Sequence, residues 1–458
     1  MTKGKYQAVQ TFELADPRAM AVRTLERVHD GAYSNLQLDA MIKRSHLTER
    51  DVHFMTNLVY GVIQHRLTLD YWLGHFVKQS NQLDPWVREL LFLALYQWQF
   101  LDKVPQHAIF DQAIELAKRR GHAGIRKFVT GVLHAMDRQG LPALTAISDP
   151  TERLAITYSL PQWLMQRLID DYGSARAEKI AASLNQAPAQ SVRVNTAEMT
   201  VAQAQAELEQ AGFTVTPSLL SPVALRLTGG GHISESVAFQ SGKITIQDEA
   251  ATLMVPSLDV KPGMRVLDAA AAPGGKTTQI ATYLDAQAGG VVEALDIHPH
   301  KVDLIQANAK RLHVADRIHA RALDARQVDQ QFADNSFDRI LVDAPCSGLG
   351  LLRRKPEVRY EKHLADSYAL QKVQLAILDA VASMLKVGGR LVYGTCTVLT
   401  IENDDVVAAF IARHPEYRLV PTYVDKDRSL TDKQGLVHIL PDQYQTDGFF
   451  IATLERIK

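Results

Sequence analysis

Near-continuous apolar runs alternate with helical stretches from about residue 241 to the end of the chain, and this alternation constrains the fold most strongly. The apolar runs are RVLDAA, VVEALDI, IHARALDA, RILVDA, GRLVYGT and GFFIATL, and the stretches between them include GKTTQIATYL and PHKVDLIQANAKRL. Strands that are apolar along their whole length are typical of a mostly parallel sheet that helices cover on both faces. We therefore predict a doubly wound α/β domain over residues 241–458.

The first third of the chain has a different pattern, in which apolar residues recur every three or four positions. In RAMAVRTLERVHDG, the residues Ala21, Leu25 and Val28 follow this spacing, and Gly31 is placed to end the helix. The pattern predicts a compact all-helical domain over residues 1–145. From residue 146 to 240, helical stretches mix with extended ones such as QSVRVNT, which predicts a small α+β module between the two larger domains.

Composition restricts the environment and the partners of the chain. The formal net charge of the 458 residues is −1 at pH 7, so bulk charge does not indicate a polyanionic partner. With 2 cysteines, no apolar leader and no apolar run long enough to span a bilayer, the sequence predicts a cytoplasmic protein with free thiols and no membrane partner. A basic stretch, LAKRRGHAGIRKF, is either a solvated helix end or a patch for RNA phosphates.

In a doubly wound sheet, ligands bind beyond the carboxyl ends of the strands, near the point where strand order reverses. The segment RVLDAAAAPGGKTT has the required form, because a strand ending at Asp268 is followed by a turn of small residues and then a helix. Asp296, Asp324 and Asp343 end the next three strands, so four carboxylates would lie along one edge. A single aspartate at a strand end is usually a helix cap or turn former, but four in succession favour a binding site.

The sequence of the turn argues against some classes of cofactor. It matches neither GxGxxG nor GxxxxGK[ST], which argues against dinucleotides and nucleoside triphosphates. Asp296 follows the turn by about 20 residues, the offset at which an acid binds ribose hydroxyls in nucleotide-binding folds. We therefore expect a nucleoside cofactor without a pyrophosphate. His298 and His300 lack a further His or Cys at ligand spacing, so no metal site is expected.

Both cysteines of the chain follow strand ends on this same predicted edge. Cys346 stands in ILVDAPCSG and Cys396 in GRLVYGTCTV. An arbitrary intracellular cysteine is more often a small buried hydrophobe. Two thiols on neighbouring strand ends, with no others in the chain, instead favour a pair that shares a covalent reaction. The spacing does not decide which of the two would be the nucleophile.

These segments resemble a known family. DAAAAPGGKTT, DAPCSG, RRKPEVRY, YGTCTVLTIEN and DGFF closely resemble the S-adenosylmethionine-dependent RNA cytosine-C5 methyltransferases. In the helical third, YGV, PQHAIFDQAIELAK and KFVTGVLH resemble a NusB-like RNA-binding domain. Together they resemble bacterial 16S rRNA methyltransferases of the Sun/Fmu/RsmB type over nearly the whole chain. The resemblance implies a NusB-like domain at 1–145, an α+β linker module at 146–240 and a Rossmann-like class I methyltransferase domain at 241–458.

The resemblance also implies roles for individual residues. Asp296 would bind the ribose hydroxyls of S-adenosyl-L-methionine and Asp324 its adenine side. Asp343 would contact the target cytosine and help its ring accept charge, and it would also contribute to cofactor binding. Cys396 would be the nucleophile and Cys346 would assist release of the product. The methionine end of the cofactor would be held by the turn residues Ala271, Ala272, Pro273, Gly274, Gly275 and Lys276.

The expected reaction is methylation of carbon 5 of a specific cytosine in 16S rRNA. Carbon 5 is too weakly nucleophilic to react unaided, and addition of a thiolate to carbon 6 activates it. The base must leave its stack, so we expect a single-stranded or loop substrate, in naked rRNA or an early assembly intermediate, with no protein partner. The alternatives are the same chemistry on tRNA or 23S rRNA, or a catalytically silent RNA-binding assembly factor.

Two further predictions concern contacts with RNA. The segment LLRRKPEVRY follows the Cys346 motif, and its basic residues are expected to bind phosphates beside the target base rather than to form a merely solvated loop. These residues are Arg353, Arg354, Lys355 and Arg359. Arg193, in VRVNT of the middle module, resembles a family position near the RNA, although the signal is weak by itself.

Overall fold

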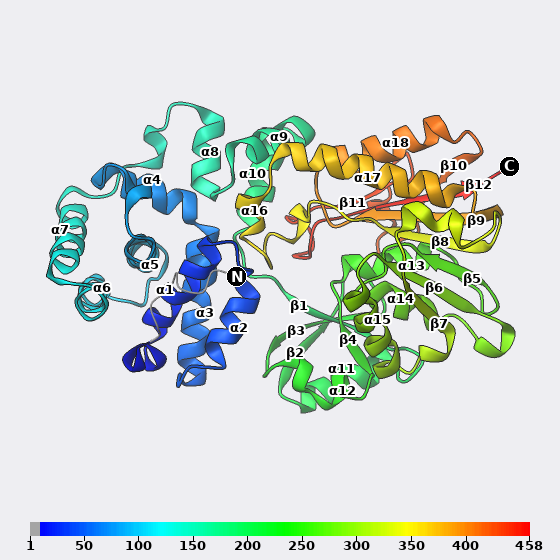
Figure 1. Cartoon of the computed structure of the whole chain (residues 1–458), viewed down its shortest axis with the longest axis horizontal. Helices are drawn as coiled ribbons and strands as arrows, with labels where there is room; N and C mark the ends of the chain where they lie inside the picture. The colour runs from blue at the N-terminus through cyan, green and yellow to red at the C-terminus, as the bar shows by residue number, and fades with distance from the viewer. Residues whose placement is uncertain (1–9) are drawn as a thin grey trace. The chain divides into compact units, whose positions relative to one another are not determined.

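The structure is a computed structural model that describes residues 10–458, and the chain divides into two compact units (Figure 1). The first unit holds the chain up to Asn185 together with Arg354–Glu361, and the second holds Gln186–Arg353 and Lys362–Lys458. Within residues 10–458, no helix has the length and apolar character needed to cross a bilayer.

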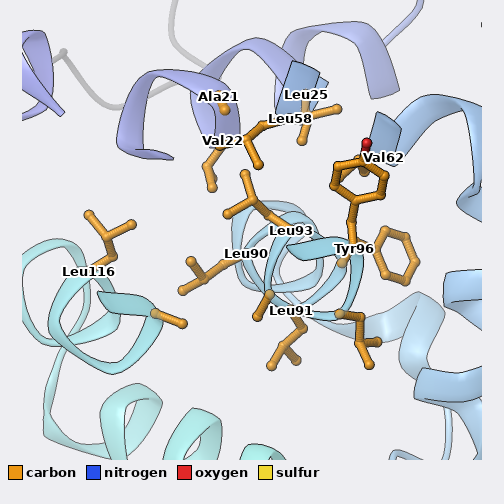
Figure 2. Packing of buried hydrophobic residues seen from close by; sticks show 14 of the residues in the cluster. Ala21, Val22, Leu25, Leu58, Val62, Leu90, Leu91, Leu93, Tyr96 and Leu116 are labelled. Atoms are coloured by element: carbon orange, nitrogen blue, oxygen red, sulfur yellow. The ribbon is translucent and has the colours of Figure 1, made fainter. Parts of the chain in front are cut away.

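Helices build the first unit, which confirms the predicted all-helical front third. Helix α5 is buried on all sides, with almost every residue from Trp86 to Gln97 inside, so it forms the centre around which the other helices pack. Figure 2 shows Leu90, Leu93 and Tyr96 of α5 surrounded by apolar residues of α1, α3 and α6. The helices are α1 (Pro17–His29), α2 (Ser34–Ile42), α3 (Glu49–Gln64), α4 (Arg66–Phe76), α5 (Pro85–Phe100), α6 (Gln106–Arg120), α7 (Ala123–Gln139), α8 (Pro150–Tyr158), α9 (Gln162–Tyr172) and α10 (Ser174–Ser183).

One residue of the basic stretch LAKRRGHAGIRKF forms an internal ion pair. Arg120, at the end of α6, is bound to Glu26 of α1 at 2.7 Å, and both side chains are 7% exposed. Its guanidinium also lies over the Trp86 ring, 4.8 Å from the centroid. Arg126 and Lys127 of α7 are exposed, so only part of the stretch is open to solvent.

The segment Arg354–Glu361, which includes α16 (Val358–Glu361), is packed inside the first unit. The fully buried Arg359 guanidinium donates to the carbonyl oxygens of Gln64 and Ser159, each at 3.2 Å, and to the amide oxygen of Asn185 at 2.8 Å. Glu357 accepts hydrogen bonds from the amide and hydroxyl of Ser34 at 3.1 and 2.8 Å.

The prediction that Arg353 and Arg359 bind RNA phosphates is therefore wrong. Arg353 is 3% exposed and donates to the carbonyl oxygen of Pro441 in the second unit, while Arg359 is engaged as described above. Both guanidinium groups satisfy main-chain acceptors, and neither is available to solvent phosphate. Lys355 is exposed and Arg354 is half-buried.

A small antiparallel sheet opens the second unit, with strand order β2-β3-β1-β4. It confirms the predicted α+β module, with α11 covering the sheet through Ala204 and Leu208. The elements are β1 (Gln190–Val194), α11 (Val201–Gln210), β2 (Phe213–Pro217), β3 (Ala224–Gly229), α12 (Val237–Gln240) and β4 (Ile244–Ile246).

The large sheet of the second unit has the order β10-β12-β9-β8-β5-β6-β7, with β11 beside β12. The five strands from β9 to β7 are parallel, as predicted. At one side of the sheet, β12 pairs antiparallel with β9, with β10 and with β11. The strands are β5 (Arg265–Asp268), β6 (Val291–Asp296), β7 (Ile318–Ala322), β8 (Phe337–Asp343), β9 (Leu385–Thr395), β10 (Tyr417–Val420), β11 (Val437–Ile439) and β12 (Phe449–Arg456).

Helices cover both faces of this sheet, as the apolar strands predict. Successive residues point to opposite faces, so Leu267 packs with α17 and α18 while Val266 packs with α13, α14 and α15. Figure 1 shows α17 and α18 on one face and α14 and α15 on the other. The helices are α13 (Met254–Ser257), α14 (Gly275–Ala281), α15 (Pro299–Arg311), α17 (Leu364–Ala382) and α18 (Asp404–Arg413).

Candidate active site

The strand order of the large sheet places a ligand crevice at the carboxyl ends of β5 and β8. From β5 the chain proceeds to β6 and β7 on one side, whereas β8 and β9 lie on the other, so β5 and β8 flank the switch point. A cavity of about 450 Å³ opens there. Its lining includes Ala269, Ala270, Ala272, Asp296, His298, Lys301, Asp324, Arg326, Asp343, Pro345, Cys346 and Cys396.

The turn after β5 forms the floor of an adjoining cavity of about 160 Å³, which shares Ala270, Ala272 and Asp343 with the larger one. Of the predicted turn residues, only Gly274 lines neither cavity. Its φ is +102°, and a Cβ atom on it would lie 3.1 Å from the Cα of Ile305 in α15. Glycine at this position therefore lets the turn and α15 approach closely. The other predicted turn residues all line the smaller cavity and are Ala271, Ala272, Pro273, Gly275 and Lys276.

Asp296 and Asp324 lie at the larger cavity and also shape their own loops. Asp296 accepts a hydrogen bond from the amide of His298 at 2.9 Å. Asp324 caps the short helix that follows it and is bound to the Arg326 guanidinium, with Nη2 2.6 Å from Oδ2. The hydrogen bonds from Arg326 lower the pKa of Asp324, which keeps this carboxylate ionised.

Asp268, at the end of β5, is completely buried against the smaller cavity. Its Oδ2 accepts a hydrogen bond from Thr277 at 2.7 Å, and its Oδ1 has no partner among residues 10–458. Burial raises the pKa of Asp268 to about 7. A buried carboxylate oxygen with an open bonding position fits a ligand that carries an ammonium group, such as the methionine end of S-adenosyl-L-methionine. The sequence marked Asp268 as a strand end, but its burial was not predicted.

Lys276 and Asp343 form an ion pair at the wall that the two cavities share. The Lys276 Nζ lies 2.6 Å from Oδ2 of Asp343, and it lies 5.2 Å from the centroid of the Phe449 ring. Burial by itself would lower the pKa of Lys276, but the charge of Asp343 and the nearby Cys396 outweigh it and the pKa is raised. Lys276 is therefore a fixed positive charge beside the cysteines.

The two thiols are in contact, with Cys346 Sγ and Cys396 Sγ 3.2 Å apart, and both cysteines are free. The contact follows from the sheet, because Asp343 at the end of β8 is paired with Gly394 of β9, and each cysteine follows its strand closely. The hydrogen bond with Cys396, burial and the nearby charge of Glu402 raise the pKa of Cys346 well above its usual value.

Two glycines hold the loops of the cysteines together. The Gly350 amide donates to the carbonyl oxygen of Cys396 at 2.9 Å, and the Gly448 amide donates to the carbonyl oxygen of Gly350 at 2.9 Å. A Cβ atom on Gly350 would collide with the carbonyl oxygen of Gly448, so no larger residue fits. The DGFF segment, quoted above as a motif, thus supports the Cys396 loop.

Arg193 lies inside the protein rather than at an RNA surface. It is 2% exposed and donates to Oε1 of Gln247 at 2.8 Å, to Oγ1 of Thr278 at 3.1 Å and to the carbonyl oxygen of Gly275 at 3.3 Å. Burial lowers its pKa to about 10. Arg193 therefore joins the small sheet to the start of α14 beneath the site.

Comparison with known proteins identifies three matching segments. Residues 15–138 match the NusB family, residues 160–234 match a ferredoxin-like domain of RsmF/B-like methyltransferases, and residues 255–455 match the 16S rRNA methyltransferase RsmB/F family. The NusB match falls on α1 to α7, the ferredoxin-like match on α9, α10 and the strands β1 to β3, and the RsmB/F match on the large sheet.

Full-length relatives and a solved structure agree with these matches. The chain is 42% identical over 444 residues to the probable ribosomal RNA small subunit methyltransferase B of Bacillus subtilis, covering 96% of this chain and 98% of the relative. It is 32% identical to the ribosomal RNA small subunit methyltransferase B of Serratia proteamaculans, covering 89% and 91%. The crystal structure of PH0851 is 27% identical, with a TM-score of 0.81 over 99% of this chain and 100% of that one. The chain therefore belongs to the RsmB-type 16S rRNA methyltransferases, S-adenosylmethionine-dependent enzymes with a NusB domain, a ferredoxin-like domain and an α/β catalytic domain.

Proposed function

We propose that this protein methylates carbon 5 of one cytosine in 16S rRNA through a covalent bond between Cys396 and carbon 6. The observation that carries the proposal is the contact of the two thiols at 3.2 Å, beside the Lys276–Asp343 pair and at the mouth of a nucleoside-sized cavity. S-adenosyl-L-methionine supplies an electrophilic methyl group. The carboxylates of Asp268, Asp296 and Asp324 would hold it, with Ala271–Lys276 closing one side.

The thiols would divide the reaction between them. An electron pair of the Cys396 thiolate would form the bond to carbon 6, and the displaced π pair would let carbon 5 take the methyl group, whose old bond leaves its electron pair on the departing thioether. A base, either water or the thiolate form of Cys346, would then take the proton from carbon 5, which restores the double bond and expels the Cys396 thiolate. The hydrogen bond with Cys396 and burial raise the pKa of Cys346. The assignment of Cys396 as the nucleophile rests on the resemblance of its GTCT motif to the family.

Lys276 and Asp343 would stabilise the charge that develops on the base. Addition of a thiolate puts negative charge on the ring, and a positive charge held in place beforehand stabilises it most effectively. Asp343 fixes Lys276 at 2.6 Å, so the ammonium group needs no rearrangement during the step. The target base must be extruded to reach this site, which supports a loop or single strand of naked rRNA or an early assembly intermediate.

Methylation mapping on candidate RNAs tests the proposal. The purified full-length protein and S-adenosyl-L-methionine are incubated separately with 16S rRNA, 23S rRNA and tRNA, and 5-methylcytosine is located by bisulfite sequencing. We expect one newly protected cytosine in 16S rRNA and none when Cys396→Ala replaces the wild type. Protection confined to 23S rRNA or tRNA would contradict the substrate, and protection by Cys396→Ala would contradict the chemistry.

A further inference from the structure

Each side of Cys346 is held by a buried polar residue that the reaction above does not use. Glu402 is fully buried, and its Oε2 accepts a hydrogen bond from the amide of Ser347, the residue after Cys346, at 2.8 Å. The same oxygen accepts from Nε2 of Gln374 in α17 at 3.1 Å. Gln374 in turn donates to the carbonyl oxygen of Pro345, the residue before Cys346, at 3.0 Å. Glu402 and Gln374 therefore fix both neighbours of the cysteine.

Asn403, the next residue in the chain, holds the other cysteine in the same way. Its Oδ1 accepts a hydrogen bond from the hydroxyl of Thr395 at 2.5 Å, and its Nδ2 donates to the carbonyl oxygen of Thr397 at 3.2 Å. Thr395 and Thr397 are the residues on either side of Cys396. The hydroxyls of Ser347 and Thr397 also lie 2.9 Å apart, so the two loops are bonded to each other.

Glu402 lies close to the Cys346 thiol. Its Oε1 is buried and has no hydrogen-bond partner in the described chain. Glu402 is one of the groups that raise the pKa of Cys346. The other groups near this thiol are Cys396, the buried phenol of Tyr393, and the Lys276–Asp343 pair across the cavity.

We propose that Glu402 and Asn403 are positioning residues that hold the two thiols in contact, and that the Glu402 carboxylate, which is bonded to the loop of Cys346, gives this thiol a reactivity different from that of Cys396. This inference rests on the proposed function for its catalytic meaning. It explains how two chemically identical side chains on adjacent strands acquire different tasks: one loop lies against a buried carboxylate and the other against an amide. Neither Glu402 nor Asn403 has to touch RNA or cofactor for this.

The electrostatic part is tested by alkylation of Cys346 in a Cys396→Ala background, without RNA. In Glu402→Gln, the side-chain oxygen can take the place of Oε2 and accept the same two hydrogen bonds. The NH₂ group then takes the place of Oε1, which has no partner in the described chain, so the variant removes the carboxylate and keeps the contacts. We expect iodoacetamide to alkylate Cys346 about tenfold faster at pH 8 in this variant, which corresponds to a pKa lower by about one unit. Asp404→Asn, which removes a half-buried neighbouring carboxylate that contacts His438, is the matched control and should leave the rate unchanged. An equal rate in Glu402→Gln and its parent would overturn this part.

The geometric part is tested with phenylarsine oxide, which bridges two thiols only when they are adjacent. We expect phenylarsine oxide to bind the wild-type protein, which has both cysteines, at least tenfold more tightly than it binds Asn403→Ala. Equal affinity for the two proteins would overturn the positioning role of Asn403. Asn403→Asp keeps the acceptor for Thr395 and loses the donor to Thr397, so it provides a second variant if the alanine does not fold. The two experiments measure an alkylation rate and a binding affinity, and neither requires methylation. Their outcome therefore does not depend on the RNA substrate.

Discussion

At the scale of single residues, burial decides what the strand-end aspartates do. All four carboxylates end up at the two adjoining cavities, which the parallel strand pattern predicts. Their different environments were not predictable, because they depend on side chains distant in sequence. Arg326 pairs with Asp324 and Lys276 with Asp343, while Asp268 is buried with one oxygen free. Glu402 and Asn403 stood within a recognised motif, yet only the contacts reveal which loop each one holds.

The raised pKa of Asp268 predicts a specific pH dependence of stability. The pKa is about 7 in the folded chain, against about 3.9 in an unfolded one, so the cofactor-free folded state binds the extra proton between these values. The stabilisation from this group is present at low pH and lost as pH rises through about 7. Relative to Asp268→Asn, we expect the free energy of unfolding of the wild type to fall by about 3 kcal/mol between pH 5 and pH 8.

Urea unfolding of both proteins at several pH values measures this difference. Asp268→Asn preserves the side-chain shape and cannot titrate, so the other groups cancel in the comparison. Curves that stay parallel from pH 5 to pH 8 would show that Asp268 is ionised throughout this range.

At the scale of elements, the apolar runs predicted the strands but not all of their directions. Five runs form the parallel part of the sheet, whereas GFFIATL forms β12, which is antiparallel to β9. A strand buried on both faces has the same apolar pattern in either direction, so the sequence could not distinguish them. Direction depends on the connection before β12: β12 follows β11 with no helix between them, and the two strands pair antiparallel.

The segment Arg354–Glu361 shows where charge in a sequence misleads. RRKPEVRY has the composition of a solvent-exposed basic loop, but the acceptors that bury Arg359 come from residues 64, 159 and 185. The sequence gives no signal that these acceptors, two main-chain carbonyl groups and one side-chain amide, lie together. The buried arginine is a structural residue of the helical unit.

Replacing Arg359 is therefore expected to affect stability. Arg359→Ala leaves several buried carbonyl groups without donors and removes a large buried side chain, so we expect the free energy of unfolding to fall by about 3 kcal/mol. Lys355→Ala, at an exposed position in the same segment, is the control and should change it by less than about 0.5 kcal/mol. Denaturant unfolding gives the comparison. Unchanged stability combined with weaker RNA binding in Arg359→Ala would restore the phosphate-binding role.

At the scale of the whole molecule, the resemblance predicted more than the residue patterns could. Periodicity indicated helices, a mixed module and a doubly wound sheet, and composition gave no sign of an RNA partner at a net charge of −1. The motifs identified the family, and full-length relatives confirm it. We keep the division at 1–145, 146–240 and 241–458 as a proposal for three functional parts. By contacts, the chain forms two compact units, with the small sheet and the large sheet in one of them.

The covalent step is the central claim, and trapping the adduct tests it most directly. Cys346→Ala protein is incubated with 16S rRNA and S-adenosyl-L-methionine, and protein bound to RNA is measured on a denaturing gel, followed by mass spectrometry of the nuclease-treated peptide. We predict that Cys346→Ala accumulates an adduct on Cys396 and that the Cys346→Ala/Cys396→Ala double variant forms none. An adduct on Cys346 in the Cys396→Ala protein, with none in Cys346→Ala, would contradict the assignment of the nucleophile.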